Sequence, residues 1–253
     1  MNPFLLLAFI LWGYMTCWFI FSLFLKRNDI ADIAWGLGFV LMAWLSFDYG
    51  TQPKYALLIS LLVTIWGIRL ALHIYLRNRK KTEDYRYLEW RKTWRHFYIR
   101  SYLQVFMLQG VFLYVISLPF LVTNLVPAHF DSLLVPLGVI LWTVGFLFES
   151  VGDLQLSRFI SQPENKGKLM TSGLWKYSRH PNYFGEVAVW WGIFLLAYAV
   201  TGNLLLIISP LLITVLLLAI SGIPLLEKKY EGRADWEEYK RKTSALFPLP
   251  PRK

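Results

Sequence analysis

The stretch GLWKYSRHPNYFGEVAVWWGIFLLAYAV, residues 173–200, joins a short polar corner to a long apolar run. Pro181 suits the first turn of a helix, because its missing N–H would have no partner inside the helix at that point. About 20 consecutive apolar residues are enough to cross the hydrocarbon core of a bilayer. We therefore expect a helix that begins near Pro181 and spans a membrane over residues 182–200.

Long apolar runs of this kind recur along the whole chain. Hydrophobic residues make up 56% of the sequence, with 12 Trp, 14 Tyr and 18 Phe, which is typical of integral membrane proteins with aromatic belts. The sequence thus predicts an all-α, multi-pass membrane bundle. Its seven expected spans cover residues 3–25, 30–48, 55–77, 98–122, 131–153, 182–200 and 203–226.

The positive charges of the chain are distributed very unevenly. Of its 26 Lys and Arg residues, 24 lie in alternate connections and in the C-terminal tail, and the exceptions are Lys54 and Arg69. By the positive-inside rule, loops 77–97 and 154–181 and the C-terminus are cytoplasmic, and the N-terminus is outside. The net charge of +10 then mostly serves to orient the chain in the membrane, which argues against nucleic acid as a partner. The remaining positive charge is available for membrane lipids or for an anionic ligand.

The connections are too short to form domains of their own. We expect one membrane domain over residues 1–253, capped by loops 77–97 and 154–181 and by the tail 227–253. The only cysteine, Cys17, excludes disulfides and multi-cysteine metal sites. The histidines lack the paired spacing of zinc ligands, so no metal site is predicted. They are His73, His96, His129 and His180.

The polar corner before Pro181 has the features of an anion site. Lys176, Arg179 and His180 would lie beside the free N–H groups and the positive dipole end of the helix, an arrangement that binds phosphate or carboxylate. The alternative is that these are ordinary positive residues at a helix end, with Glu186 paired to a buried cation.

Several ionisable residues fall at membrane depth, where each is a site hypothesis. Asn182 and Glu186 are four apart and share a helix face, and Glu149 and Asp153 repeat that spacing. The alternative is a set of buried ion pairs that hold the helices in register. We expect the following residues to line one polar cleft open to the cytoplasm: Asp32, Arg69, Glu149, Asp153, Arg179 and Glu186.

The segment after the last span mixes fork-shaped donors, acceptors and flat rings. These residue types suit a nucleotide cofactor. They are Glu227, Tyr230, Arg233, Trp236 and Tyr239. An amphipathic helix lying on anionic lipid is the alternative for this segment.

At these residues the chain resembles the DUF1295 family, which is grouped with the steroid 5-alpha-reductases, the sterol reductases and the isoprenylcysteine carboxyl methyltransferases. In this resemblance Asn182 and Glu186 fall on an NxxGE pattern, and Asp153 fits the acid of the preceding cofactor helix. The matching pieces are Asp32 with Trp35-Gly36, Glu149 to Asp153, SRHPNYFGE at residues 178–186 with Trp190-Trp191-Gly192, and Glu227 to Tyr239 followed by Phe247-Pro248.

The resemblance implies NADPH on the cytoplasmic side and a lipid-facing cavity for a flat, lipophilic substrate. Hydride would pass to an electron-poor C=C bond conjugated to a carbonyl, which needs a donor that polarises the carbonyl. Steroid reductases use a glutamate that follows a glutamine on an early span, and this chain has no such pair. The proton donor is therefore unassigned, and we name Tyr102, His96 and Asp32 as candidate catalytic residues. The alternative for Tyr102 and His96 is interfacial anchoring, which we favour for the nearby Tyr98.

The expected activity is an NADPH-dependent membrane reductase. The alternatives are an S-adenosylmethionine-dependent methyltransferase of the isoprenylcysteine type and a lipid or sterol binder without chemistry. The residues expected to bind the cofactor are Glu149, Asp153, Lys176, Tyr177, Arg179, His180, Asn182, Tyr183, Glu186, Glu227, Tyr230, Arg233 and Tyr239.

Overall fold

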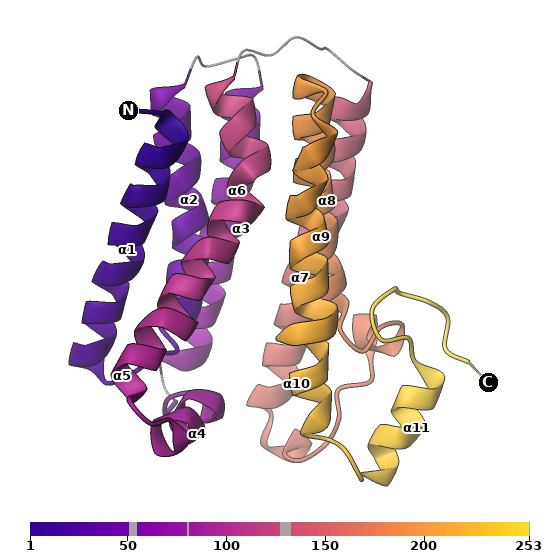
Figure 1. Ribbon diagram of the computed structural model, residues 1–253. Helices are drawn as coiled ribbons and strands as arrows, with labels where there is room; N and C mark the ends of the chain where they lie inside the picture. Colours follow the sequence, from indigo (N-terminus) through magenta and orange to yellow (C-terminus); the bar gives the residue numbers. More distant parts are fainter. Residues whose placement is uncertain (51–54, 80, 127–132, 253) are drawn as a thin grey trace. The chain divides into compact units, whose positions relative to one another are not determined.

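The computed structural model describes residues 1–50, 55–79, 81–126 and 133–252. In these ranges the chain is helical, and its one β-bridge, between Ser178 and Ser244, is isolated (Figure 1). Four of the basic and histidine residues counted in the sequence lie outside the described residues: Lys54, Lys80, His129 and Lys253.

Seven of the described helices are long and apolar enough to cross a membrane, which confirms the predicted all-α multi-pass architecture. The fourth and seventh spans are composite. The spans are α1 (Pro3–Leu25), α2 (Ala31–Tyr49), α3 (Ala56–Asn78), α5 with η1 and α6 (Phe97–Leu125), α7 (Leu134–Ser161), α8 (Pro181–Thr201), and η4 with α9, η5 and α10 (Leu204–Lys228).

Two short α-helices lie outside the spans, in addition to the 3-10 turns η2 (Pro163–Asn165) and η3 (Gly173–Lys176) between α7 and α8. They are α4 (Tyr85–Thr93), in the loop after α3, and α11 (Ala234–Lys242), in the C-terminal tail. Helix α7 runs to Ser161, past the predicted end of its span at residue 153. Hydrophobicity sets the end of a span, but the helix continues until Pro163 disfavours helical backbone at the residue before it.

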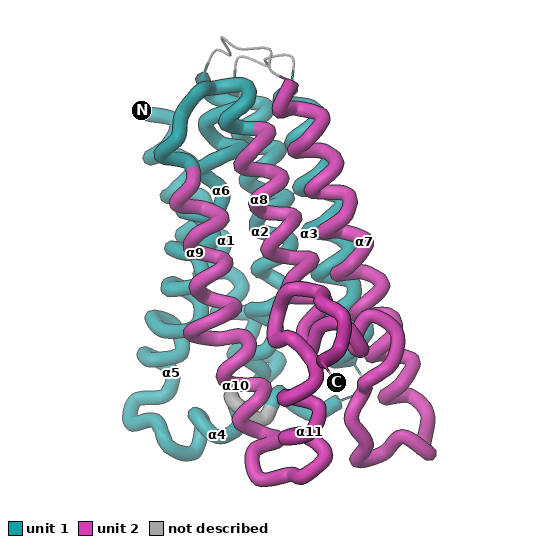
Figure 2. Tube along the Cα trace, turned by 90° about the vertical axis from the view of Figure 1, so that its right-hand side faces the viewer, with its two compact units in different colours: residues 1–131, 197–206 teal, residues 132–196, 207–253 magenta. Residues whose placement is uncertain are grey.

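The chain forms two compact units (Figure 2), which we describe separately. Unit 1 contains Met1–Asp131 with Ala197–Leu206, and unit 2 contains Ser132–Leu196 with Ile207–Lys253. The expectation of one membrane domain and the predicted orientation of the termini both stay predictions.

In unit 1, helices α2 and α3 approach each other at two glycines. A Cβ atom on Gly36 would lie 2.7 Å from the carbonyl oxygen of Gly67, and one on Gly67 would lie 2.6 Å from that of Gly36. Small residues allow this close helix packing in membranes. The neighbouring core contains Phe39 and Trp66, which are fully buried and meet edge to face.

In unit 2, helices α7 and α8 pack through glycines on both sides. A Cβ on Gly145 would lie 2.6 Å from Gly185 O, and one on Gly185 would lie 2.4 Å from the backbone nitrogen of Glu149. A Cβ on Gly152, seven residues after Gly145, would meet the first residues of α8. This packing fixes the start of α8 against the water-side part of α7, where the predicted polar residues lie.

Candidate functional site

Arg179 is the centre of a buried ion pair in unit 2. Its Nε donates to Glu227 Oε1 at 2.9 Å, and its Nη2 donates to Oε2 of the same carboxylate at 3.3 Å. His180 Nε2 lies 3.0 Å from Glu227 Oε1. We call Arg179, His180 and Glu227 the arginine latch. It joins the residue before α8 to α10 (Ile223–Lys228), the last turn of the final span.

The latch also holds the C-terminal tail. Arg179 Nη1 donates to the carbonyl of Thr243 at 2.6 Å and to that of Lys240 at 3.3 Å. The Arg179 side chain is only 9% exposed, and all three of its nitrogens donate to protein acceptors. Its predicted role as a cofactor ligand stays a prediction, but here its hydrogen bonds hold the corner together.

Backbone and hydroxyl groups complete the attachment of the tail. Arg179 N donates to Ser244 O at 2.8 Å, and Ser178 Oγ donates to Leu246 O at 2.8 Å. The buried Tyr239 hydroxyl donates to the carbonyl of Trp175, and burial raises the pKa of this tyrosine above its ordinary value. The tail is therefore hydrogen-bonded to the residues that precede α8 at several points.

The predicted tail residues Tyr230 and Arg233 are connected to Arg179 through a row of ring contacts. The Arg233 guanidinium lies 5.6 Å from the Tyr230 ring, Tyr230 packs against Trp236 at 5.3 Å, and Trp236 lies 5.6 Å from the Arg179 guanidinium. Arg233 itself is at the surface, where it pairs with Asp235. Arg179 and Arg233 are thus connected through the two rings, but Arg179 pairs with Glu227 and Arg233 pairs with Asp235.

Asn182, in the first turn of α8, faces α7. Its Nδ2 donates to Asp153 Oδ1 at 3.1 Å, and its Oδ1 is buried and has no hydrogen-bond partner. In this bond the amide nitrogen faces Asp153 and the amide oxygen faces away from it. Buried acceptors are almost always satisfied, so Asn182 Oδ1 is a position for a donor from a ligand or from ordered water.

The other predicted cofactor residues fall into two groups. Glu149 and Asp153 are buried on α7, while Tyr183 and Glu186 are partly buried on α8; Tyr183 stacks on His180 with ring centroids 5.5 Å apart.

Lys176 and Tyr177 instead have exposed side chains. Their backbone carbonyls bind the tail, accepting from Thr243 Oγ1 and from Leu249 N.

The three predicted catalytic residues lie in unit 1. The Tyr102 hydroxyl lies 3.1 Å from Thr16 Oγ1, and Asp32 Oδ1 accepts from the Tyr87 hydroxyl at 3.4 Å. His96 is exposed and has φ of 56°, a left-handed turn that precedes α5 (Phe97–Arg100). Their catalytic roles stay predictions, as does the single cleft expected to include Asp32 and Arg69.

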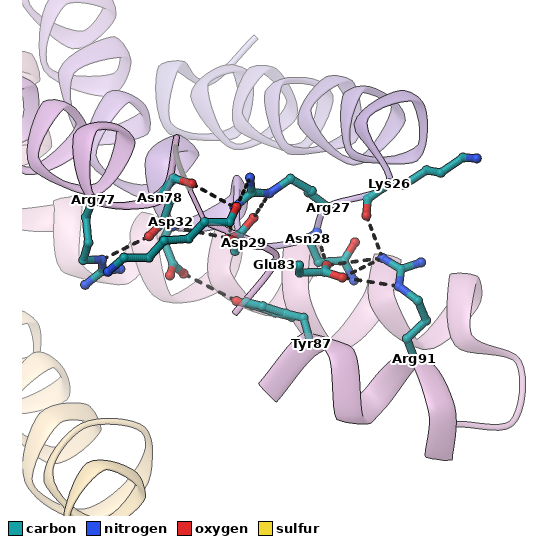
Figure 3. Close-up of polar contacts among 11 residues, drawn as sticks. Lys26, Arg27, Asn28, Asp29, Asp32, Arg77, Asn78, Glu83, Tyr87 and Arg91 are labelled. Atoms are coloured by element: carbon teal, nitrogen blue, oxygen red, sulfur yellow. Dashed lines mark hydrogen bonds and ion pairs between the residues drawn. The ribbon is translucent and has the colours of Figure 1, made fainter. Parts of the chain in front are cut away.

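A buried polar network surrounds Asp32 in unit 1 (Figure 3). Arg27 binds Asp29 through a fork of 3.0 and 2.7 Å, and Asn28 N donates to Glu83 Oε1 at 2.6 Å. Arg91 donates to the same Glu83 carboxylate at 3.2 Å. The network ties the turn between α1 and α2 to the segment that contains α4.

Sequence reasoning missed most of this network and part of the corner. Glu83 and Asn28 are 55 positions apart, and no local pattern joins them. In the corner, Gln155 Oε1 accepts from Leu174 N at 2.9 Å, and Trp175 Nε1 donates to Gly152 O at 3.1 Å. Gln155 also lines an open surface hollow of about 280 Å³ with Arg158, Gln162 and Ser172. The sequence signal that could have indicated the Arg27–Asp29 pair is the spacing of two between these opposite charges.

The described helices define a class: a multi-pass helical membrane protein in which α7, α8 and the tail bring polar and charged side chains together. The chain belongs to the DUF1295 family, whose model, described as a protein of unknown function, matches residues 18–243. This confirms the predicted family. No curated protein and no solved structure matches the chain.

Proposed function

We propose that the protein is an NADPH-dependent membrane reductase that acts on a lipophilic substrate with a C=C bond conjugated to a carbonyl. The proposal rests on the resemblance of its corner to the steroid 5-alpha-reductase group and on one structural observation. That observation is Asn182 Oδ1, a buried acceptor without a donor beside the Asp153 carboxylate.

A nicotinamide cofactor carries N–H groups that can donate a hydrogen bond to Asn182 Oδ1. Carboxamide and adenine amino groups each carry N–H bonds, and a buried amide oxygen gains a hydrogen bond by accepting one of them. The exposed Lys166, Lys168 and Lys176 supply positive charge for the phosphates of the cofactor. The arginine latch holds the C-terminal tail against the residues before α8, so that less of this region has to become ordered when the cofactor binds.

The reaction consumes one NADPH and one proton for each substrate. NADPH, when bound, supplies a hydride to the β-carbon, and a proton adds to the α-carbon, so that the carbonyl is retained and NADP⁺ is released. The chain must hold the cofactor in one orientation, exclude water and direct a donor at the carbonyl oxygen, where negative charge develops. Tyr102, His96 and Asp32 remain the proposed sources of the proton.

Turnover tests this proposal. Purified protein in lipid nanodiscs should oxidise NADPH, followed by its absorbance, only when a steroid-like or other lipophilic enone is present. Asn182→Ala should reduce kcat/KM by about tenfold, the effect of one lost hydrogen bond to a charged or polar ligand. Asn165→Ala is the matched control, because the Asn165 side chain bonds to Phe159 O at the end of α7 and to Gln162 Oε1 just after it, and not to Asp153 or to α8. An enone-independent or absent oxidation overturns the proposal.

S-adenosylmethionine also carries an amino donor, and the methyltransferase remains the second candidate for that reason. The same nanodiscs should then transfer a labelled methyl group to a lipophilic carboxylate. Methyl transfer without NADPH oxidation would replace the reductase by this alternative, and the absence of both would leave a lipid binder.

A further inference from the structure

The segment Leu246–Pro251 carries large apolar side chains at the surface. Phe247 is 63% exposed and Leu249 is 51% exposed, whereas the preceding residue, Leu246, is buried. Three prolines, Pro248, Pro250 and Pro251, limit the freedom of this segment. It therefore presents two large apolar side chains outward from a backbone that is held in place.

These side chains continue the apolar surface of the spanning helices. The Phe148 ring on α7 meets Phe184 on α8 at 5.1 Å, and Phe184 meets Phe247 at 6.0 Å. Leu147, next to Phe148, is 53% exposed, as expected for the lipid face of a spanning helix. Figure 1 shows the C-terminal segment turning back from α11 toward these helices.

Basic side chains flank the apolar segment. Arg241 and Arg252 are exposed, and Arg252 N donates to Lys242 O at 2.9 Å, which places the two ends of the segment together. Lys240 and Lys242 are neutralised locally by Glu237 and Glu238. Apolar and aromatic side chains bordered by arginines are the combination that binds a bilayer interface with anionic headgroups.

We propose that Leu246–Pro251 is an interfacial anchor whose partner is the lipid bilayer, with Phe247 and Leu249 inserted among the headgroups and acyl ends. The bilayer then stabilises the corner itself. Leu246 O accepts from Ser178, and Thr243 O accepts from Arg179, so a tail held by lipid keeps the latch closed. The inference concerns membrane contact and holds whichever reaction the corner supports.

Site-directed fluorescence tests the anchor. In a Cys17→Ser background, which removes the only cysteine, Phe247→Cys is labelled with bimane, and the protein is placed in nanodiscs of phosphatidylcholine and phosphatidylserine with spin-labelled lipid. Leu249→Cys is the second position if the first variant fails to fold. Leu147→Cys on α7 is the lipid-facing reference, and Glu238→Cys, on the exposed side of α11, is the water-facing reference.

The anchor predicts that spin-labelled lipid removes as much fluorescence at position 247 as at position 147, and that aqueous iodide removes little. Omitting phosphatidylserine should reduce the lipid quenching, and Arg241→Gln with Arg252→Gln should abolish that dependence. Iodide quenching equal to that at position 238 overturns the proposal. Protection from both quenchers also overturns it, because a second copy or another protein would then cover the segment.

Discussion

Arg179 Nε and Glu227 Oε1 lie 2.9 Å apart, although 48 positions separate the two residues in sequence. The pair connects the beginning of α8 to the end of the last spanning helix, and His180 binds the same carboxylate. A charged side chain that the sequence suggests for ligand binding therefore has a structural partner. The ion pair therefore holds the start of α8, the end of the last span and the C-terminal tail together.

Arg179→Met should lower the free energy of unfolding by about 2 to 4 kcal/mol, because it leaves the Glu227 carboxylate without its fork partner in a mostly buried position. Glu227→Met should have a similar effect through the uncompensated arginine. The measurement is thermal and denaturant unfolding in one detergent.

The double variant supplies the control for this pair. If the two residues act on each other, Arg179→Met with Glu227→Met should be less destabilised than the sum of the single variants, by at least about 1 kcal/mol. Simple additivity would show that the contact contributes little.

Tyr239→Phe should cost about 1 kcal/mol at neutral pH through the lost hydrogen bond to Trp175 O. Burial raises the pKa of Tyr239 above its ordinary value of 10.0, so above that pH the unfolded tyrosine loses its proton while the folded one keeps it. Stability should thus fall as pH rises beyond about 10. The variant should show a smaller fall than the parent, and equal slopes would contradict the burial argument.

Gly185→Ala should destabilise unit 2 by about 1 to 3 kcal/mol, because the added Cβ would lie 2.4 Å from the Glu149 backbone nitrogen. Gly13→Ala is the matched control on α1. A Cβ there meets nothing within 4 Å, and alanine is the better helix former. Unfolding midpoints should move in opposite directions, and a neutral Gly185→Ala would show that α7 and α8 can separate freely.

The pairs Arg27–Asp29 and Arg233–Asp235 offer a matched comparison of burial. Both are forks at a spacing of two, but the side chain of Asp29 is 2% exposed and that of Asp235 is 53% exposed. Asp29→Asn should cost about 2 to 4 kcal/mol, since Arg27 loses its buried counter-charge. Asp235→Asn should leave the unfolding midpoint unchanged within error, and a similar loss in both would contradict the assigned role of burial.

The spans were predictable because hydrophobic length is a local property of the sequence. The start of α8 at Pro181 and the seven spans are confirmed, as is the family. The extension of α7 to Ser161 and the short helix α4 were not predicted. Both lie in water-side segments, where helix formation depends on capping and tertiary contact more than on hydropathy.

The site was harder to predict than the fold. Composition correctly marked the corner as polar, and the four-residue spacing put Asn182 and Glu186 on one face. The partners of Arg179, however, come from Glu227, Thr243 and Lys240, and one sequence does not reveal which distant carboxylate or carbonyl meets a cation. For the same reason the network around Asn28 and Glu83 was missed.

Cofactor binding tests the central claim most directly. Calorimetry on the intact protein in nanodiscs should give about micromolar affinity for NADPH, or roughly −8 kcal/mol, with tenfold weaker binding by Asn182→Ala and unchanged binding by Asn165→Ala. S-adenosylmethionine should give no signal under the same conditions. If NADPH fails to bind, or binds Asn182→Ala as tightly as the parent, the corner is not the cofactor site that we propose.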